Sequence, residues 1–82
     1  MIVYVVNSEY AYGTFRGSLC IGVYDSKEKA QKVMKDQIEN TNNRWTNFGK
    51  ANDTEVIITD DMSVISLEDK CETIKIIEKK VF

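Results

Sequence analysis

The fold of this 82-residue chain is decided by residues 23–40, VYDSKEKAQKVMKDQIEN. An apolar, glycine-marked segment ends at Asp25, and a charged run follows. Asp25 and Glu28 have the spacing of a capping box, so we expect a helix to begin there. The apolar residues that follow span about 140° of one helical face. They are Ala30, Val33, Met34 and Ile38. The pattern predicts a helix over about 25–40 that covers one face of a sheet, with a partner-binding helix as the alternative.

Strand-like segments lie on both sides of this helix. The first, MIVYVV (1–6), is apolar on both alternating faces, which is typical of a central strand covered on both sides. Residues 7–18 hold two glycines, two serines and three aromatic residues, so we expect a loop there, with a long first hairpin as the alternative. The other predicted strands are LCIGVY (19–24), TEVIIT (54–59), MSVISL (62–67) and CETIKIIEKKVF (71–82).

The order ββαβββ predicts one α+β domain over residues 1–82, with a mainly antiparallel sheet packed on one face by one helix. One short helix cannot hide all the apolar strand residues, so we also expect a symmetric homodimer. The apolar residues that prompt this expectation are Val5, Ile57, Ile65, Ile74, Ile76 and Ile77.

The composition excludes several kinds of chemistry. The chain has no histidine, which excludes histidine acid–base catalysis and histidine-based triads. Two cysteines are too few for a usual structural zinc site, and no phosphate-binding Walker motif is present. We therefore expect a protein that is not an enzyme and that uses no cofactor or metal. Cys20 and Cys71 are predicted to be buried, reduced thiols, with a disulfide between neighbouring strands as the alternative.

The charge pattern bears on partners and location. The net charge is −2, and residues 51–82 carry four basic and eight acidic groups. Because duplex DNA binding needs a basic face, we expect no binding to duplex DNA. The apolar run at residues 1–6 is too short for a signal peptide or a membrane span. We expect a cytoplasmic protein that does not contact a membrane.

Three stretches are candidate binding sites. The first, EYAYGTFR (9–16), gathers aromatic and arginine side chains of the kind that dominate protein interfaces. The alternative is that these rings extend the sheet and pack in its core. The predicted partner-binding residues are Tyr10, Tyr12, Phe15 and Arg16.

The second stretch, NNRWTNFGK (42–50), alternates cations with rings, as single-stranded nucleic-acid sites do. Its candidate residues are Arg44, Trp45, Phe48 and Lys50. The alternative is that Trp45 closes one end of the core.

The third stretch is acidic and runs over residues 53–72. It could mimic a phosphate backbone or bind a divalent ion, although it lacks the spacing of a calcium loop. The alternative is a set of solvated turns and strand edges. Its acidic residues are Asp53, Glu55, Asp60, Asp61, Glu68, Asp69 and Glu72.

MIVYVV (1–6) and IGVYDSKEKAQKVM (21–34) resemble small uncharacterised bacterial and phage proteins. Those proteins begin with a VYVV strand and continue with a GVF/Y-[DS]-S-x-E-x-A strand-to-helix step. The similarity covers residues 2–6 and 21–34, under a quarter of the chain. It implies a small cytoplasmic accessory protein of a bacterial cell, because many such phage products bind and block a host factor or a defence system.

These observations predict a non-enzymatic binding protein that acts by protein–protein contact, such as a phage-encoded inhibitor of a host or defence factor. One alternative is a protein that sequesters a small ligand such as a nucleotide, with its pocket at a dimer interface. The other is a single-stranded nucleic-acid binding module.

Overall fold

A computed structural model describes residues 1–46, 54–67 and 70–81. It contains five strands and one helix in the predicted order ββαβββ. The elements are β1 (Ile2–Tyr12), β2 (Phe15–Tyr24), α1 (Lys27–Thr46), β3 (Glu55–Ile58), β4 (Met62–Leu67) and β5 (Lys70–Lys80). The α+β fold class predicted from the sequence is confirmed.

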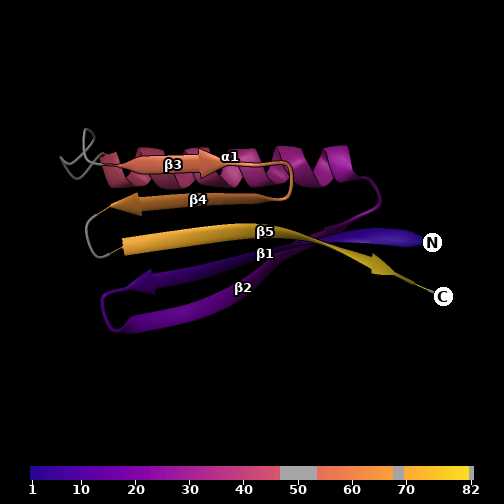
Figure 1. The fold of residues 1–82 in the computed structure, drawn as a ribbon, viewed down its shortest axis with the longest axis horizontal. Coiled ribbons are helices and arrows are strands. Elements are labelled where there is room, and N and C mark those ends of the chain that lie inside the picture. Colours follow the sequence, from indigo (N-terminus) through magenta and orange to yellow (C-terminus); the bar gives the residue numbers. More distant parts are fainter. Residues whose placement is uncertain (47–53, 68–69, 82) are drawn as a thin grey trace.

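The strands form one antiparallel sheet in the order β2-β1-β5-β4-β3. Figure 1 shows β5 between β1 and β4, with β2 and β3 at the two edges. Helix α1 lies on the β3 and β4 side of the picture, and β2 lies at the opposite edge. The helix therefore leaves the helix-side surface of the β1–β2 hairpin only partly covered. Within the part of the chain that the structure describes, no helix is long and apolar enough to cross a bilayer.

Residues 7–18 were predicted to be a loop, but most of them belong to the two strands of the first hairpin. Strand β1 continues to Tyr12, and β2 starts at Phe15, so only Gly13 and Thr14 form the turn. Gly13 has φ 64°, in the left-handed region that glycine adopts without steric cost. The aromatic residues favour strand over loop because a pleated surface suits their rings. The long first hairpin, which was the alternative prediction, is the observed structure.

Among residues 1–46, 54–67 and 70–81, the sheet is covered on one face only, by α1. Strand alternation places Tyr4, Val6 and Ser8 toward α1, and Val5 and its neighbours toward the other face. A β-bulge opposite the Val6–Asn7 step shifts the alternation of β2. The prediction that residues 1–6 are covered on both sides is therefore wrong, because the one helix packs on a single face.

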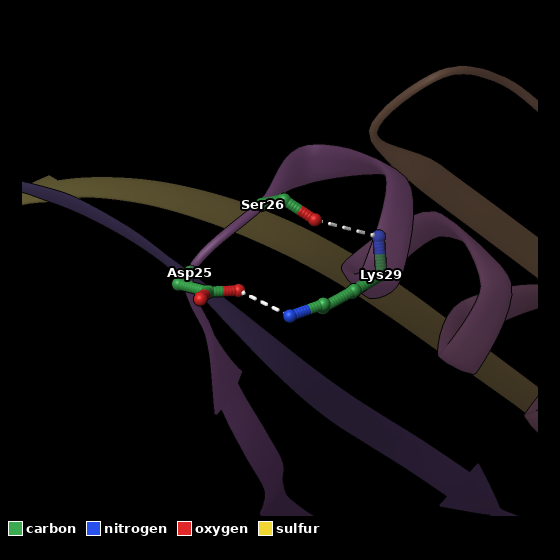
Figure 2. A network of polar contacts seen from close by, with 3 residues as sticks. All are labelled: Asp25, Ser26 and Lys29. Carbon is green, nitrogen blue, oxygen red and sulfur yellow. Dashed lines mark hydrogen bonds and ion pairs between the residues drawn. The ribbon is translucent and has the colours of Figure 1, made fainter.

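The capping residue of helix α1 lies one residue later than predicted, and the helix begins at Lys27. Ser26, not Asp25, is the capping residue, and its Oγ accepts a hydrogen bond from the Lys29 backbone N–H at 3.2 Å (Figure 2). The Asp25 carboxylate instead accepts a hydrogen bond from Lys29 Nζ at 2.9 Å. That hydrogen bond lowers the pKa of Asp25 below its ordinary value. The capping box between Asp25 and Glu28 does not form, because Ser26 takes the capping position.

The helix continues to Thr46 rather than ending near residue 40. Its apolar stripe extends with it, so Trp45 also lies against the sheet and is only 6% exposed. Met34 and Ile38 are buried as predicted, and Val33 is partly buried against the same cluster. The core consists of Val6, Ala30, Met34, Ile38, Trp45, Ile65, Leu67 and Ile74.

Several apolar strand residues remain outside this core. Ile57 and Ile77 are exposed, and so is Val23 on the edge strand β2. The prediction that one helix cannot cover all the apolar strand residues is thus confirmed for Ile57 and Ile77, while Ile65 and Ile74 are fully buried beneath α1.

Candidate functional site

Four aromatic rings form a continuous array at the hairpin end of the sheet. Trp45 meets the Tyr12 ring edge-on, with centroids 6.1 Å apart. Tyr12 stacks on Tyr10 at 5.6 Å, and Tyr10 stacks on Phe15 at 5.9 Å. The array therefore begins in the core at Trp45 and ends in solvent at Phe15, which is 63% exposed. We call these four residues the aromatic array.

Strand geometry explains why the array forms. Tyr10 and Tyr12 are two residues apart on β1, so they share the helix-side face. The register places Tyr12 opposite Phe15 and Tyr10 opposite Gly17. A side chain at Gly17 would overlap the Tyr10 phenol, so the ring of Tyr10 lies in the space that glycine leaves open.

The structure separates the four residues of the primary predicted site. Tyr10, Tyr12 and Phe15 belong to the array, which is built from strands and not from the predicted loop. Arg16 pairs with Ala11 and points to the opposite face of the sheet, where it lines a shallow hollow of about 460 Å³. Arg16 therefore lies on the face of the sheet opposite the stacked rings, although Tyr10 also lines this hollow.

A buried glutamate lies beside the array. Glu72 is 5% exposed and sits between β5 and α1. Ser8 Oγ donates to its Oε1 at 3.0 Å, and Thr41 Oγ1 donates to its Oε2 at 2.9 Å. Arg44 Nη2 donates to Thr41 Oγ1 at 3.3 Å, so Thr41 connects the guanidinium to the carboxylate. This cluster joins β1, β5 and α1 directly beneath the tyrosines.

The pKa of Tyr12 is changed by its burial and by the nearby charges of Glu72 and Arg44. Burial raises the pKa of the Tyr12 phenol above its ordinary value, and the nearby Glu72 carboxylate raises it further. The Arg44 guanidinium acts in the opposite direction. Tyr12 therefore stays protonated at neutral pH and remains available as a hydrogen-bond donor.

Sequence reasoning missed two features of this region. Leu19 lies on the helix-side face of β2 and is 62% exposed, so it extends the apolar surface beyond Phe15. Glu72 was predicted to belong to an acidic surface, yet it faces the core. The sequence did contain a signal for the burial of Glu72, because Glu72 is two residues from the apolar Ile74 and shares a strand face with it.

The secondary candidate residues fall at opposite ends of the molecule. Arg44 is exposed next to the array, and Trp45 is buried in it. Phe48 and Lys50 lie outside the described residues. Asp60 and Asp61 lie in the turn between β3 and β4, and Gln31, near the start of α1, donates to the Asp60 carbonyl at 3.0 Å. Figure 1 shows this turn at the end of the sheet away from the β1–β2 turn.

The acidic stretch does not form one surface among the described residues. Glu55 is exposed on β3, Asp60 and Asp61 are exposed in the turn, and Glu72 is buried. Asp53, Glu68 and Asp69 lie outside the described residues.

The cysteines are free thiols on strands that do not touch. Cys20 is exposed on β2 and Cys71 is half-buried on β5, with β1 between them. The prediction of two buried thiols is therefore wrong, because both side chains point away from α1. No group of three or more His, Cys, Asp or Glu side chains that could hold a metal occurs within residues 1–46, 54–67 and 70–81.

Two small hollows adjoin the array. One, of about 210 Å³, is lined by Tyr10, Tyr12, Arg44 and Glu72 together with Ser8, Leu19 and Gln37. The second, of about 240 Å³, is lined by Tyr12, Arg44, Trp45 and Lys70. Both are smaller than the ~300–1,000 Å³ of a usual small-molecule site.

Residues 1–78 match the model of a protein family, DUF7336, described as a domain of unknown function. The chain belongs to the DUF7336 family. The DUF7336 match spans the sequence of the aromatic array and of the Glu72 cluster. No curated protein and no solved structure matches the chain.

Proposed function

We propose that this protein is a non-enzymatic binding protein that recognises another protein through the hairpin surface formed by Tyr10, Tyr12, Phe15 and Leu19. One observation carries the proposal: the stacked aromatic array runs from the buried Trp45 to the exposed Phe15. Large aromatic side chains are enriched among the residues that dominate binding energies at protein interfaces.

Stacking prepares this surface for binding. Tyr10 is held between Tyr12 and Phe15, so its ring already has a defined orientation before a partner arrives. Ordering a mobile side chain on binding costs about 0.5–1.5 kcal/mol. A surface whose rings are already packed avoids part of that cost, and Arg44 at its rim can steer an approaching acidic group.

The resemblance to bacterial and phage accessory proteins supports a protein of the bacterial host cell as the partner, such as a defence factor that this chain inhibits in the cytoplasm. The geometry favours a protein over the two alternative partners. The two hollows beside the array are small for a nucleotide, and the larger one at Arg16, of about 460 Å³, is shallow and open rather than an enclosing pocket. Trp45 is buried, so its ring offers no face on which a nucleic-acid base could stack.

The test compares a variant that removes exposed apolar side chains from the hairpin surface with one that removes an exposed apolar side chain from the other edge of the sheet. Phe15→Ala combined with Leu19→Ser removes the exposed part of the hairpin surface. Ile57→Ala is the matched control, because Ile57 is 60% exposed on β3, the other edge of the sheet. Both variants must first show wild-type thermal unfolding.

Each protein is then used to capture partners from a bacterial lysate, and a captured protein is purified and titrated by calorimetry. We expect the control to bind like wild type and the hairpin variant to bind at least tenfold more weakly, about 1.4 kcal/mol. Equal affinity of all three proteins for that partner would refute the proposed surface. A small molecule that co-purifies with wild type and is identified by mass spectrometry would favour the ligand-binding alternative.

A further inference from the structure

The two edges of the sheet are built differently. Strand β3 has four residues, whereas β2 has ten and pairs only with β1 among the described strands. Natural proteins protect long edges with lysine, proline, inward-pointing charges or β-bulges. The bulge of β2 lies opposite the Val6–Asn7 step, beyond residue 19, so the first half of β2 is a regular edge. Strand β2, FRGSLCIGVY, contains no proline and one charged residue, Arg16. It also carries the exposed side chains of Phe15, Leu19 and Val23.

The first half of β2 has a symmetric pattern. Residues 15–19, FRGSL, are apolar, polar, glycine, polar and apolar in order, with Gly17 at the centre. Phe15 and Leu19 share the helix-side face, and Arg16 and Ser18 share the other. When such a strand pairs with a copy of itself in antiparallel orientation about Gly17, each apolar residue faces an apolar residue and each polar residue faces a polar residue.

The turn fixes which backbone groups are free. Tyr12 is opposite Phe15 across the two turn residues, so these two exchange backbone hydrogen bonds as a hydrogen-bonded pair. Alternation then directs the backbone N–H and C=O groups of Arg16 and Ser18 outward, away from β1. Only another extended strand can satisfy such a row of groups in the manner of a sheet.

We propose that β2 pairs with β2 of a second copy of this chain, in antiparallel orientation about a two-fold axis at Gly17. In this register Arg16 lies opposite Ser18 of the second copy, and Phe15 lies opposite its Leu19. No like charges face each other, since each Arg16 meets a serine. Gly17 meets the second Gly17 as a non-hydrogen-bonded pair, the closer kind of strand pair, and glycine suits that approach. The contact is isologous and closes as a dimer.

Only the role given to the dimer rests on the proposed function. Phe15 of each copy would meet Leu19 of the other on either side of the axis, so the two hairpin surfaces would join into one surface on the helix side of a continuous sheet. Dimerisation itself requires no partner and can be measured on the purified protein alone, so the two proposals fail separately.

The register is tested by cross-linking in a background that lacks both native cysteines, C20S/C71S. Two single variants, Arg16→Cys and Ser18→Cys, are mixed and mildly oxidised. Opposite residues in a hydrogen-bonded pair have Cα atoms about 5.5 Å apart, within disulfide range. Two copies of the same variant would place their cysteines about 8 Å apart, which is too far. We expect a cross-linked dimer from the mixture and none from either variant alone.

A proline variant separates dimer loss from misfolding. Ser18→Pro removes an outward N–H, which edge strands tolerate. Leu19→Pro is the matched control, because the Leu19 N–H points inward to β1. We expect wild type to have twice the 9.4 kDa chain mass by light scattering, and Ser18→Pro to be a monomer that unfolds cooperatively. Leu19→Pro should unfold at a lower temperature than Ser18→Pro.

Three outcomes would overturn the proposal. Cross-linking of Ser18→Cys with itself would place the axis at Ser18. A wild-type protein of 9.4 kDa at several hundred micromolar would exclude the dimer. A Ser18→Pro variant that is folded and still dimeric would show that another surface forms the contact.

Discussion

The Glu72 cluster gives the sharpest prediction about stability. Thr41→Val keeps the shape of a fully buried side chain but removes the hydroxyl that donates to Glu72 Oε2 at 2.9 Å. The carboxylate then keeps one protein donor, Ser8, among the hydrogen bonds of the cluster. Since a hydrogen bond to a charged group contributes about 1.5–3 kcal/mol, we expect the free energy of unfolding to fall by about 2 kcal/mol.

Such a loss is large for this domain. At about 0.05–0.15 kcal/mol per residue, a chain of this length has a total stability of roughly 4–12 kcal/mol. Urea unfolding followed by circular dichroism measures the change. With a slope of about 1 kcal/mol/M, the midpoint should fall by about 2 M at an unchanged slope.

The control places Thr41→Val in a Glu72→Leu background. Without the carboxylate, the Thr41 hydroxyl is a buried donor whose acceptor is gone. It still accepts from Arg44 at 3.3 Å, but the exposed guanidinium can bond to water instead, so removing the hydroxyl should cost little or should stabilise the protein. A loss of about 2 kcal/mol in both backgrounds would refute the reasoning, because Thr41 would then act through its packing alone and not through the hydrogen bond.

Ile38→Ala should lower the unfolding free energy by about 2–4 kcal/mol in urea titrations, because Ile38 is only 3% exposed in the core. Ser26→Ala should cost about 0.5–2 kcal/mol through loss of the helix cap, and Asp25→Ala should lower the melting temperature less than Ser26→Ala does. The pKa of Tyr12 is raised in the folded state, so its contribution to stability is present below the ordinary value of 10.0 and is lost as the pH rises through the folded pKa. Melting temperatures between pH 8 and pH 11 should therefore fall less steeply for Tyr12→Phe than for wild type, and equal slopes would contradict the pKa shift.

The helix and the element order ββαβββ could be predicted from the sequence because each depends on a local pattern, whereas the order of the strands in the sheet depends on distant pairings and was not predicted. The apolar stripe of Met34 and Ile38 determines which face of α1 is buried. The strands β4 and β5 alternate strongly enough to be recognised, and Ile65 and Ile74 are buried on the expected side. The helix boundary was less certain, since Ser26 and Asp25 are both good capping residues and only the geometry selects Ser26.

The hairpin and the candidate site were harder to predict from the sequence, because they depend on contacts between residues that are distant in the chain. Turn-forming residues in the stretch 7–18 suggested a loop, although two central residues, Gly13 and Thr14, suffice for the turn. The aromatic residues were correctly grouped, yet the separation of Arg16 from Phe15 follows from strand alternation, which a loop would not impose. The burial of Glu72 depends on Ser8 and Thr41, which lie far away in the sequence and supply the hydroxyl donors.

The position of β5 in the sheet has a consequence for the timing of folding. Strands β1 and β2 form one hairpin and β3 and β4 another, and β5 is the strand that joins them, pairing Ile2 with Lys80 on one side and Met62 with Lys75 on the other. During synthesis at about 5–20 residues per second, both hairpins leave the ribosome before β5 does. The inner edges of β1 and β4 are then unpaired for a short time, and the helix has no completed sheet on which to pack. Pairing between residues so distant in sequence also slows folding of the released chain.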